Sequence, residues 1–286
     1  MMTRTNVDSG AIKAWIGSVS PVNWRLVLLG VIVYMVLAYV INIWVTPSKL
    51  MPSVPPSTGY FVSATFLNAL PFIVIMASLL LVVGVRGHDL GFKCARLLPA
   101  IAWVGGTWIA AQLTFLVMHA GDVSLGPVWV EPHIRQVQLG SFVTGQLLGN
   151  ALLEEVFWRA FVLTQLVLLL ERRVGLRFWS AMAWAIVLTA VLFSLSHLPH
   201  DIANELSMQQ ILGMQAVRIA GGLVFAGVFV LSGNIFVAIG LHALVDIPLP
   251  LFGPPDSMSG FMVMVPFVLL AILAILRRFR RPRTAS

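Results

Sequence analysis

Charged residues are scarce in this chain of 286 residues. Aspartate, glutamate, lysine and arginine make up 10% of it, whereas 59% is hydrophobic. A soluble domain has about a quarter of its residues charged. The scarcity excludes an ordinary soluble fold and predicts an all-α polytopic transmembrane helix bundle. The length accommodates about eight spans of roughly 20 residues and leaves no room for a sizeable soluble domain.

Cysteine is nearly absent as well. The single residue, Cys94, excludes an internal disulfide and any metal site built on several cysteines. Internal repeats are also missing, which weighs against a transporter built from two inverted halves. Chemistry, if there is any, is therefore expected from carboxylates and histidines inside the bundle.

Apolar runs bounded by proline or glycine predict the membrane spans. The runs cover residues 26–45, 60–83, 98–118, 140–170, 178–197, 213–231, 235–250 and 260–276. We therefore expect a short cytoplasmic segment at 1–25, a single transmembrane bundle over 26–276 and a basic tail at 277–286.

Lysine and arginine gather on one side of these spans. Fourteen of the 18 fall on the side of the amino terminus, whereas Lys49 and Arg135 fall on the other and Arg159 and Arg218 lie within spans. This bias predicts an integral protein of the plasma membrane with both termini in the cytoplasm. The net charge of +7 then reflects topology and contact of the tail with the lipid bilayer, and no nucleic acid is expected as a partner.

Three charges stand together in the predicted span 140–170. An ionisable residue near the bilayer centre costs about 2.5–3.5 kcal/mol and usually marks a functional site. Glu155 and Arg159 are four residues apart, so they share a helix face and are expected to pair. Glu154 points about 100° away and must face another part of the bundle. Asn150, one turn earlier on the same face as Glu154, is expected to hydrogen-bond in a cavity or to serve helix packing.

Two other spans carry polar residues at similar depth. His197 ends the fifth span one turn after Phe193, and His242 and Asp246 share a face of the seventh. Counting about 1.5 Å per residue from the cytoplasmic ends places Glu154, His197 and Asp246 in the outer half of the bilayer and His242 near its middle. We expect one cavity to hold all four. His200 and Asp201, which follow in the sequence, are expected in the next loop, where they could tune or guard the site, although a solvated loop is favoured.

The motifs Glu-Glu-x-x-x-Arg at 154–159, Phe-x-x-x-His at 193–197 and His-x-x-x-Asp at 242–246 together resemble the CPBP family of intramembrane proteases. That family includes the type II CAAX prenyl endopeptidases, bacteriocin-processing proteins and Abi-type proteins. The resemblance lies within a core of about 140–250. It rests on the order and spacing of the motifs within helices, because each motif alone is weak.

The resemblance implies an endopeptidase that cuts a peptide or a membrane-anchored protein. Glu154 and His197 would activate a water for attack on a peptide carbonyl, while His242 and Asp246 would stabilise the oxyanion. Such hydrolysis needs a base matched to the working pH and charge stabilisation where the oxyanion forms. The residues implied to support the site are Glu155, Arg159 and Phe193.

Position 246 leaves the mechanism open. The family has Asn or Asp there, and an ionised Asp246 cannot donate to an oxyanion. It could orient His242, act while protonated, or join Glu154, His197 and His242 as ligands of a divalent metal such as zinc. We prefer the metal-independent mechanism, in which no cofactor is required.

Two other functions would use the same buried residues. One is a non-catalytic membrane protein that acts as an immunity or scaffold protein, and the other is a carrier coupled to protons. The side of the membrane is a separate question, because eukaryotic prenyl endopeptidases cut cytosolic carboxyl termini whereas the charge count places this site toward the outer face. We give the charge count more weight.

Overall fold

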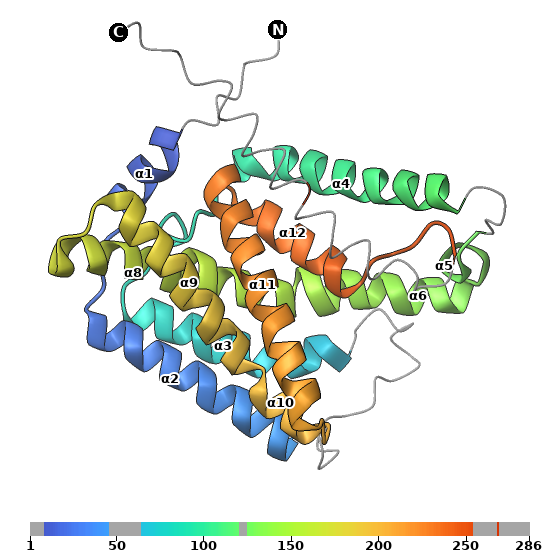
Figure 1. The fold of residues 1–286 in the computed structure, drawn as a ribbon, viewed down its shortest axis with the longest axis horizontal. Helices are drawn as coiled ribbons and strands as arrows, with labels where there is room; N and C mark the ends of the chain where they lie inside the picture. Colours follow the sequence, from blue (N-terminus) through green and yellow to red (C-terminus); the bar gives the residue numbers. More distant parts are fainter. Residues whose placement is uncertain (1–8, 46–63, 120–124, 254–267, 269–286) are drawn as a thin grey trace, which may run out of the picture.

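Long apolar helices dominate the part of the chain that the structure describes (Figure 1). The structure is a computed structural model, and it describes residues 9–45, 64–119, 125–253 and 268. The predicted eighth span, apart from Val268, and the basic tail lie outside the described residues.

The amino-terminal half of the described chain forms the helices that precede the three motifs. These are α1 (Ser9–Ser18), α2 (Trp24–Val40) continued by η1 (Ile41–Val45), α3 (Ala64–Val82), η3 (Cys94–Arg96), α4 (Leu97–Met118), α5 (Pro127–Val130) and α6 (Pro132–Gly140).

The carboxyl-terminal half carries the three motifs. Its elements are η4 (Ser141–Leu147), α7 (Asn150–Glu154), η5 (Glu155–Leu163), α8 (Thr164–Leu169), η6 (Leu170–Val174), α9 (Phe178–Ser196), α10 (Leu198–Ala203), α11 (Met208–Ser232) and α12 (Ile235–Asp246).

Four helices among the described residues are long and apolar enough to cross a membrane. They are Trp24–Ile43, Cys94–Met118, Phe178–Ala203 and Met208–Ser232. Shorter apolar helices, Ala69–Val82 and Ile235–Asp246, fall within two further predicted spans. The all-α membrane bundle is therefore confirmed, whereas the count of about eight spans is not.

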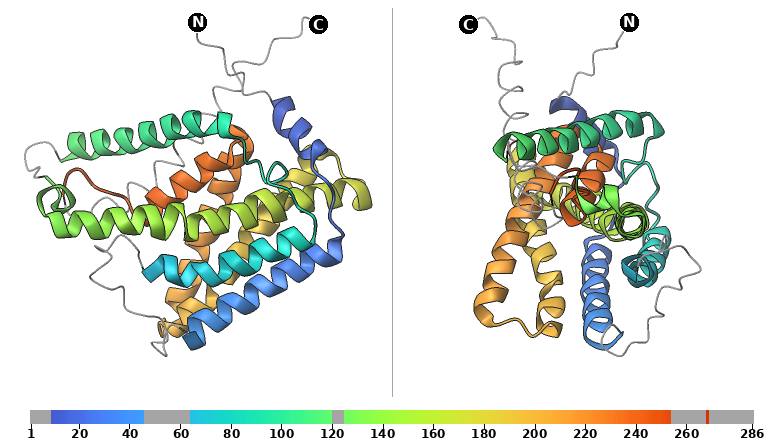
Figure 2. Two further views of the ribbon diagram at one scale, coloured as in Figure 1. Left: turned by 180° about the vertical axis from the view of Figure 1, so that it is seen from behind. Right: turned by 90° about the vertical axis from the view of Figure 1, so that its right-hand side faces the viewer.

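The helices are arranged around a central axis made of α6, η4, α7, η5 and α8. Figure 2 shows the pair α2 and α3 on one side of this axis and the pair α9 and α11 beside it, with α4 and α12 toward the opposite face. Small residues allow α9 and α11 to approach closely, since a Cβ at Gly222 would lie 3.1 Å from the Cα of Ala190. Small residues at helix interfaces are typical of membrane bundles.

The central axis is interrupted directly before the charged motif. The sequence predicts one span over 140–170, but the structure breaks the helix at Gly149, which adopts φ −115° and ψ −109°. A Cβ at this position would press against the carbonyl oxygens of Gly145 and Thr144, so the break requires glycine. The first turn after this break carries Asn150 and Glu154.

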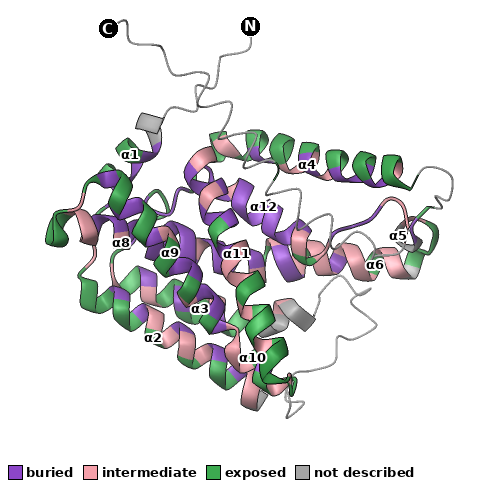
Figure 3. Cartoon of the chain, viewed as in Figure 1, coloured by how far each residue is buried: buried purple, intermediate pink, exposed green. Residues whose placement is uncertain are grey.

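Burial follows the same arrangement. Buried residues concentrate on η5, α8 and α12, whereas α4 and the outer face of α2 are largely exposed (Figure 3). The exposed side chains are themselves apolar, as Leu98 at 75% and Val117 at 74% exposure illustrate. A bundle with an apolar exterior is suited to lipid, in agreement with an integral membrane protein.

Candidate active site

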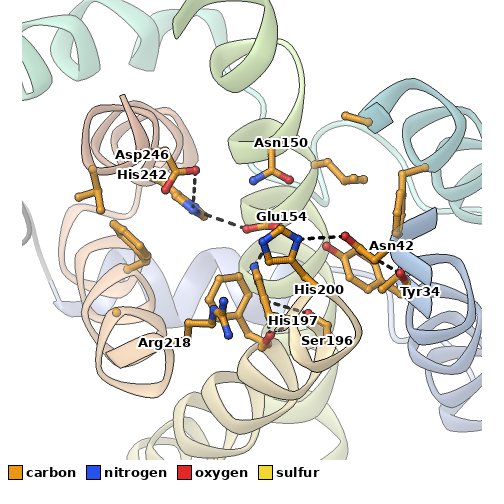
Figure 4. A pocket seen from close by; sticks show the side chains of 18 of the residues that line it. Tyr34, Asn42, Asn150, Glu154, Ser196, His197, His200, Arg218, His242 and Asp246 are labelled. Carbon is orange, nitrogen blue, oxygen red and sulfur yellow. Dashed lines mark hydrogen bonds and ion pairs between the residues drawn. The ribbon is translucent and has the colours of Figure 1, made fainter. Parts of the chain in front are cut away.

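Three helices bring the four predicted catalytic residues to one cavity. Glu154 ends α7, His197 follows the last turn of α9, and His242 and Asp246 come from the second half of α12. All four line a cavity of about 580 Å³ (Figure 4). The expectation that distant motifs share one cavity is thus met geometrically.

The Glu154 carboxylate lies between the two imidazole rings. Its Oε1 is 3.6 Å from Nε2 of His197, and its Oε2 is 3.5 Å from Nε2 of His242. Glu154 itself is buried. These separations are longer than direct hydrogen bonds, so each carboxylate oxygen faces one ring across a narrow gap within the cavity.

The backbone fixes the orientation of the His197 ring. Nδ1 lies 2.9 Å from the carbonyl oxygen of Phe193, one turn earlier on α9. A carbonyl only accepts, so Nδ1 carries the hydrogen and donates it. In the neutral ring, Nε2 is then left with a free lone pair that faces Glu154.

The His242 ring is held from two sides. Nδ1 lies 2.8 Å from Oε1 of Glu155, and the ring stacks on Phe225 with centroids 4.6 Å apart and an interplanar angle of 13°. Nε2 points to Glu154 and is 3.7 Å from Oδ2 of Asp246. The Glu155 carboxylate accepts from Nδ1, so Nε2 carries a hydrogen only when the ring is an imidazolium.

Glu155 therefore does more than pair with Arg159. Its Oε2 is 3.5 Å from the Nε of Arg159, and both side chains are fully buried. Its other oxygen is bound to His242. Sequence reasoning predicted the contact within the helix but missed the contact to α12, because residues 87 positions apart leave no local signal of their pairing.

Phe193 supports the site with its ring as well as its carbonyl. The guanidinium of Arg159 lies 4.6 Å from the ring centroid, and the His197 ring packs edge-on at 4.8 Å. Within the described residues, none of the three guanidinium nitrogens of Arg159 makes a hydrogen bond. The aromatic face and the Glu155 carboxylate are thus the groups that accommodate this buried cation.

Asn150 is the polar residue that the sequence left undecided. It lines the same cavity one turn before Glu154, and its side chain interacts with both Glu154 and Asp246. Figure 4 shows its amide group above the Glu154 carboxylate. Its spacing of four residues from Glu154 was the only signal in the sequence.

The segment after His197 differs from its prediction. A solvated loop was expected at His200 and Asp201, but the chain forms α10 and Asp201 is fully buried. Its carboxylate accepts two hydrogen bonds from Arg218, one of 2.7 Å, and one of 3.0 Å from Gln215 on α11. The expectation was wrong for Asp201 because its partner lies 17 residues away.

His200 links α10 to a different helix. Its Nδ1 is 3.2 Å from Oδ1 of Asn42 in η1, the element that continues α2. Together with the Asp201 contacts, this fixes α10 between α2 and α11, directly beyond His197. The turn that carries His197 is therefore anchored on two sides.

The site also permits a test of the metal alternative. No group of three or more histidine, cysteine, aspartate or glutamate side chains in the described ranges has an arrangement that could hold a metal ion. Glu154 presents a different oxygen to each histidine, and Asp246 approaches only His242. Because the four residues do not fit a metal site as arranged, no step below is routed through a metal.

A buried carboxylate thus lies between two histidines within a bundle of apolar helices. Residues 136–248 match the family described as Type II CAAX prenyl endopeptidase Rce1-like. The match spans all three motifs, confirms the resemblance and supports membership of the CPBP family of CAAX-type intramembrane proteases. The description of this family does not name the Abi-type proteins. Searches of curated proteins and of solved structures found no match.

Proposed function

We propose that the protein is an intramembrane endopeptidase that hydrolyses a peptide bond of a membrane-associated peptide or protein. The observation that carries the proposal is the position of the Glu154 carboxylate between Nε2 of His197 and Nε2 of His242, inside one cavity. The family match supports the class of reaction.

Glu154 and His197 are assigned to the activation of water. A water held between Oε1 of Glu154 and Nε2 of His197 would meet two acceptors, because Nδ1 of His197 donates to Phe193. Attack on the peptide carbonyl requires removal of one proton from this water, and a positioned base contributes about 10²–10⁴-fold. The base that removed this proton then returns it to the leaving amine of the peptide.

His242 is assigned to the oxyanion. Glu155 holds Nδ1, so the imidazolium form points its Nε2–H into the cavity, where charge develops on the carbonyl oxygen. Asp246, which cannot donate while ionised, favours this charged form from 3.7 Å. The amide of Asn150 is an uncharged donor on the same cavity wall, and we assign it a second hydrogen bond to the oxyanion.

The proposed topology places the site toward the outer face of the plasma membrane, with both termini in the cytoplasm. The segments predicted on the cytoplasmic side contact one another. Trp15 donates to the carbonyl of His88 at 3.3 Å, and Asn234 donates to the carbonyl of Arg96 at 2.8 Å. His197 stands at the carboxyl end of α9, away from the end that is predicted to face the cytoplasm. External protease digestion of a tagged carboxyl terminus in intact cells would contradict this topology.

The test compares peptides released from membranes of cells that carry the native protein or a variant. Glu154→Gln and His197→Ala are expected to abolish a fragment that the native protein produces, and Glu171→Gln serves as a matched control outside the site. Unchanged cleavage by Glu154→Gln would refute the mechanism. A phenotype that survives every motif substitution would favour the scaffold role, and uptake into liposomes driven by a pH gradient would favour a carrier.

A further inference from the structure

A second cavity lies between α2 and the consecutive elements η5, α8 and η6, with Leu192 of α9 also on its wall. This α2–α8 groove has a volume of about 540 Å³, and ligand pockets typically measure about 300–1,000 Å³. Its wall is mostly apolar, with Val31, Leu166 and Leu192 among its residues. Trp24 and Leu28 on the same wall are 47% and 48% exposed, so the groove is open to the surroundings of the bundle.

Two arginines close one end of the α2–α8 groove. Arg172 and Arg173 reach it from η6, the last turn before Gly175. Both are exposed, and neither forms an ion pair with a carboxylate in the described part of the chain. Cations are favourable at a helix carboxyl end, but that preference does not explain why both line an apolar groove.

The amide side chains at the same end are already engaged. Gln165 accepts from the backbone N–H of Val22 at 2.8 Å and donates to the carbonyl of Ser20 at 3.1 Å. Asn23 accepts from the backbone N–H of Arg25 as it caps α2. Arg172 and Arg173 are the charged side chains among the residues that line the groove.

An apolar groove with a cationic end is complementary to a molecule with an anionic head and an apolar chain. The bilayer supplies such molecules, and basic pockets between transmembrane helices on the cytoplasmic side bind their headgroups. The planar guanidinium matches phosphate oxygens with two parallel hydrogen bonds. We propose that the α2–α8 groove binds an acidic phospholipid, with its phosphate at Arg172 and Arg173 and an acyl chain along α2.

The expected size of the effect follows from the two charges. Each basic residue near an anionic headgroup contributes roughly fivefold in affinity, so both together contribute about 25-fold. A neutral or zwitterionic lipid with the same chains gains only the apolar contact. The groove should therefore discriminate by headgroup.

Native mass spectrometry of the purified full-length protein in detergent tests this inference. The protein is titrated with phosphatidylglycerol or phosphatidylcholine of identical acyl chains, and glycerol phosphate is added as a soluble competitor. We expect at least tenfold tighter binding of phosphatidylglycerol and a loss of about 25-fold in the double variant Arg172→Gln/Arg173→Gln. The control Arg86→Gln/Lys93→Gln removes the same charge outside the groove and should leave binding unchanged.

A second variant keeps the test decisive if the double variant does not fold. Val31→Trp fills the groove while both arginines remain, and it should also abolish tight binding of phosphatidylglycerol. Equal affinity for the two lipids, an equal loss in the control, or unchanged binding in Val31→Trp would each overturn the proposal. Effective competition by glycerol phosphate would identify a site for soluble anions instead. None of these outcomes depends on the protease activity.

Discussion

The buried pair of Glu155 and Arg159 yields a prediction that needs no substrate. Both side chains are fully buried, and Glu155 also accepts the hydrogen bond from His242. Removing one partner of a buried ion pair strands the other and costs about 3–5 kcal/mol. We expect Glu155→Gln to lower the free energy of unfolding by an amount in this range, because the guanidinium of Arg159 then loses its carboxylate partner and keeps the Phe193 ring.

Replacing the arginine of the pair should lower the free energy of unfolding by less. In Arg159→Met the Glu155 carboxylate keeps its 2.8 Å contact with His242, and an imidazolium there can balance the charge. The methionine also occupies much of the buried volume of the arginine stem. We therefore expect the loss in free energy of unfolding to be about 1–3 kcal/mol, smaller than for Glu155→Gln.

The double variant separates pairing from simple packing. Replacing both charges leaves no stranded ion, and such replacements are often neutral or stabilising. The coupling energy of the cycle should therefore reach at least about 1 kcal/mol. The measurement is the free energy of unfolding of the purified protein in mixed micelles titrated with dodecyl sulfate.

Two results would refute this reasoning. Additive losses, within about 0.5 kcal/mol, would show that Glu155 and Arg159 do not act as a pair. A larger loss in Arg159→Met than in Glu155→Gln would contradict the view that His242 shares the Glu155 carboxylate. In either case the proposed support of His242 would lose its basis.

Three further predictions concern neighbouring residues. Asn150→Ala should lower kcat about 10- to 100-fold with little change in the free energy of unfolding, since one oxyanion donor is lost; an unchanged kcat measured on the cleaved fragment would remove its assigned role. Gly149→Ala should lower the free energy of unfolding by about 1–3 kcal/mol, measured in mixed micelles, because the added Cβ meets two backbone carbonyls. Asp201→Asn should destabilise by about 3–5 kcal/mol by stranding Arg218, whereas the exposed Glu205→Gln should change stability by less than about 0.5 kcal/mol.

The sequence predicted the parts of the site that depend on local helical spacing. Glu155 and Arg159 contact each other because residues four apart share a face, and His242 and Asp246 do so for the same reason. Helix periodicity within one segment needs no knowledge of the neighbouring helices. The fold class followed in the same way from the apolar composition.

Contacts between helices could not be predicted from spacing. The rotation of each helix about its axis decides whether Glu155 meets His242, and the wide turns of η5 together with the break at Gly149 affect that rotation. Asp201 and Arg218 illustrate the same limit. Each looked isolated in the sequence, one as a loop acid and one as a cation within a span, but the fold makes them partners.

The charges of the site explain why Glu154 is the residue assigned to proton exchange. Three carboxylates, those of Glu154, Glu155 and Asp246, surround His242 at 2.8–3.7 Å. Glu155 has a fixed cation in Arg159, and an imidazolium at His242 balances one more negative charge. Of the other two carboxylates, Glu154 and Asp246, only Glu154 also faces the Nε2 of His197. A proton that Glu154 and His197 take from water stays within the cavity, where the leaving amine of the peptide can receive it.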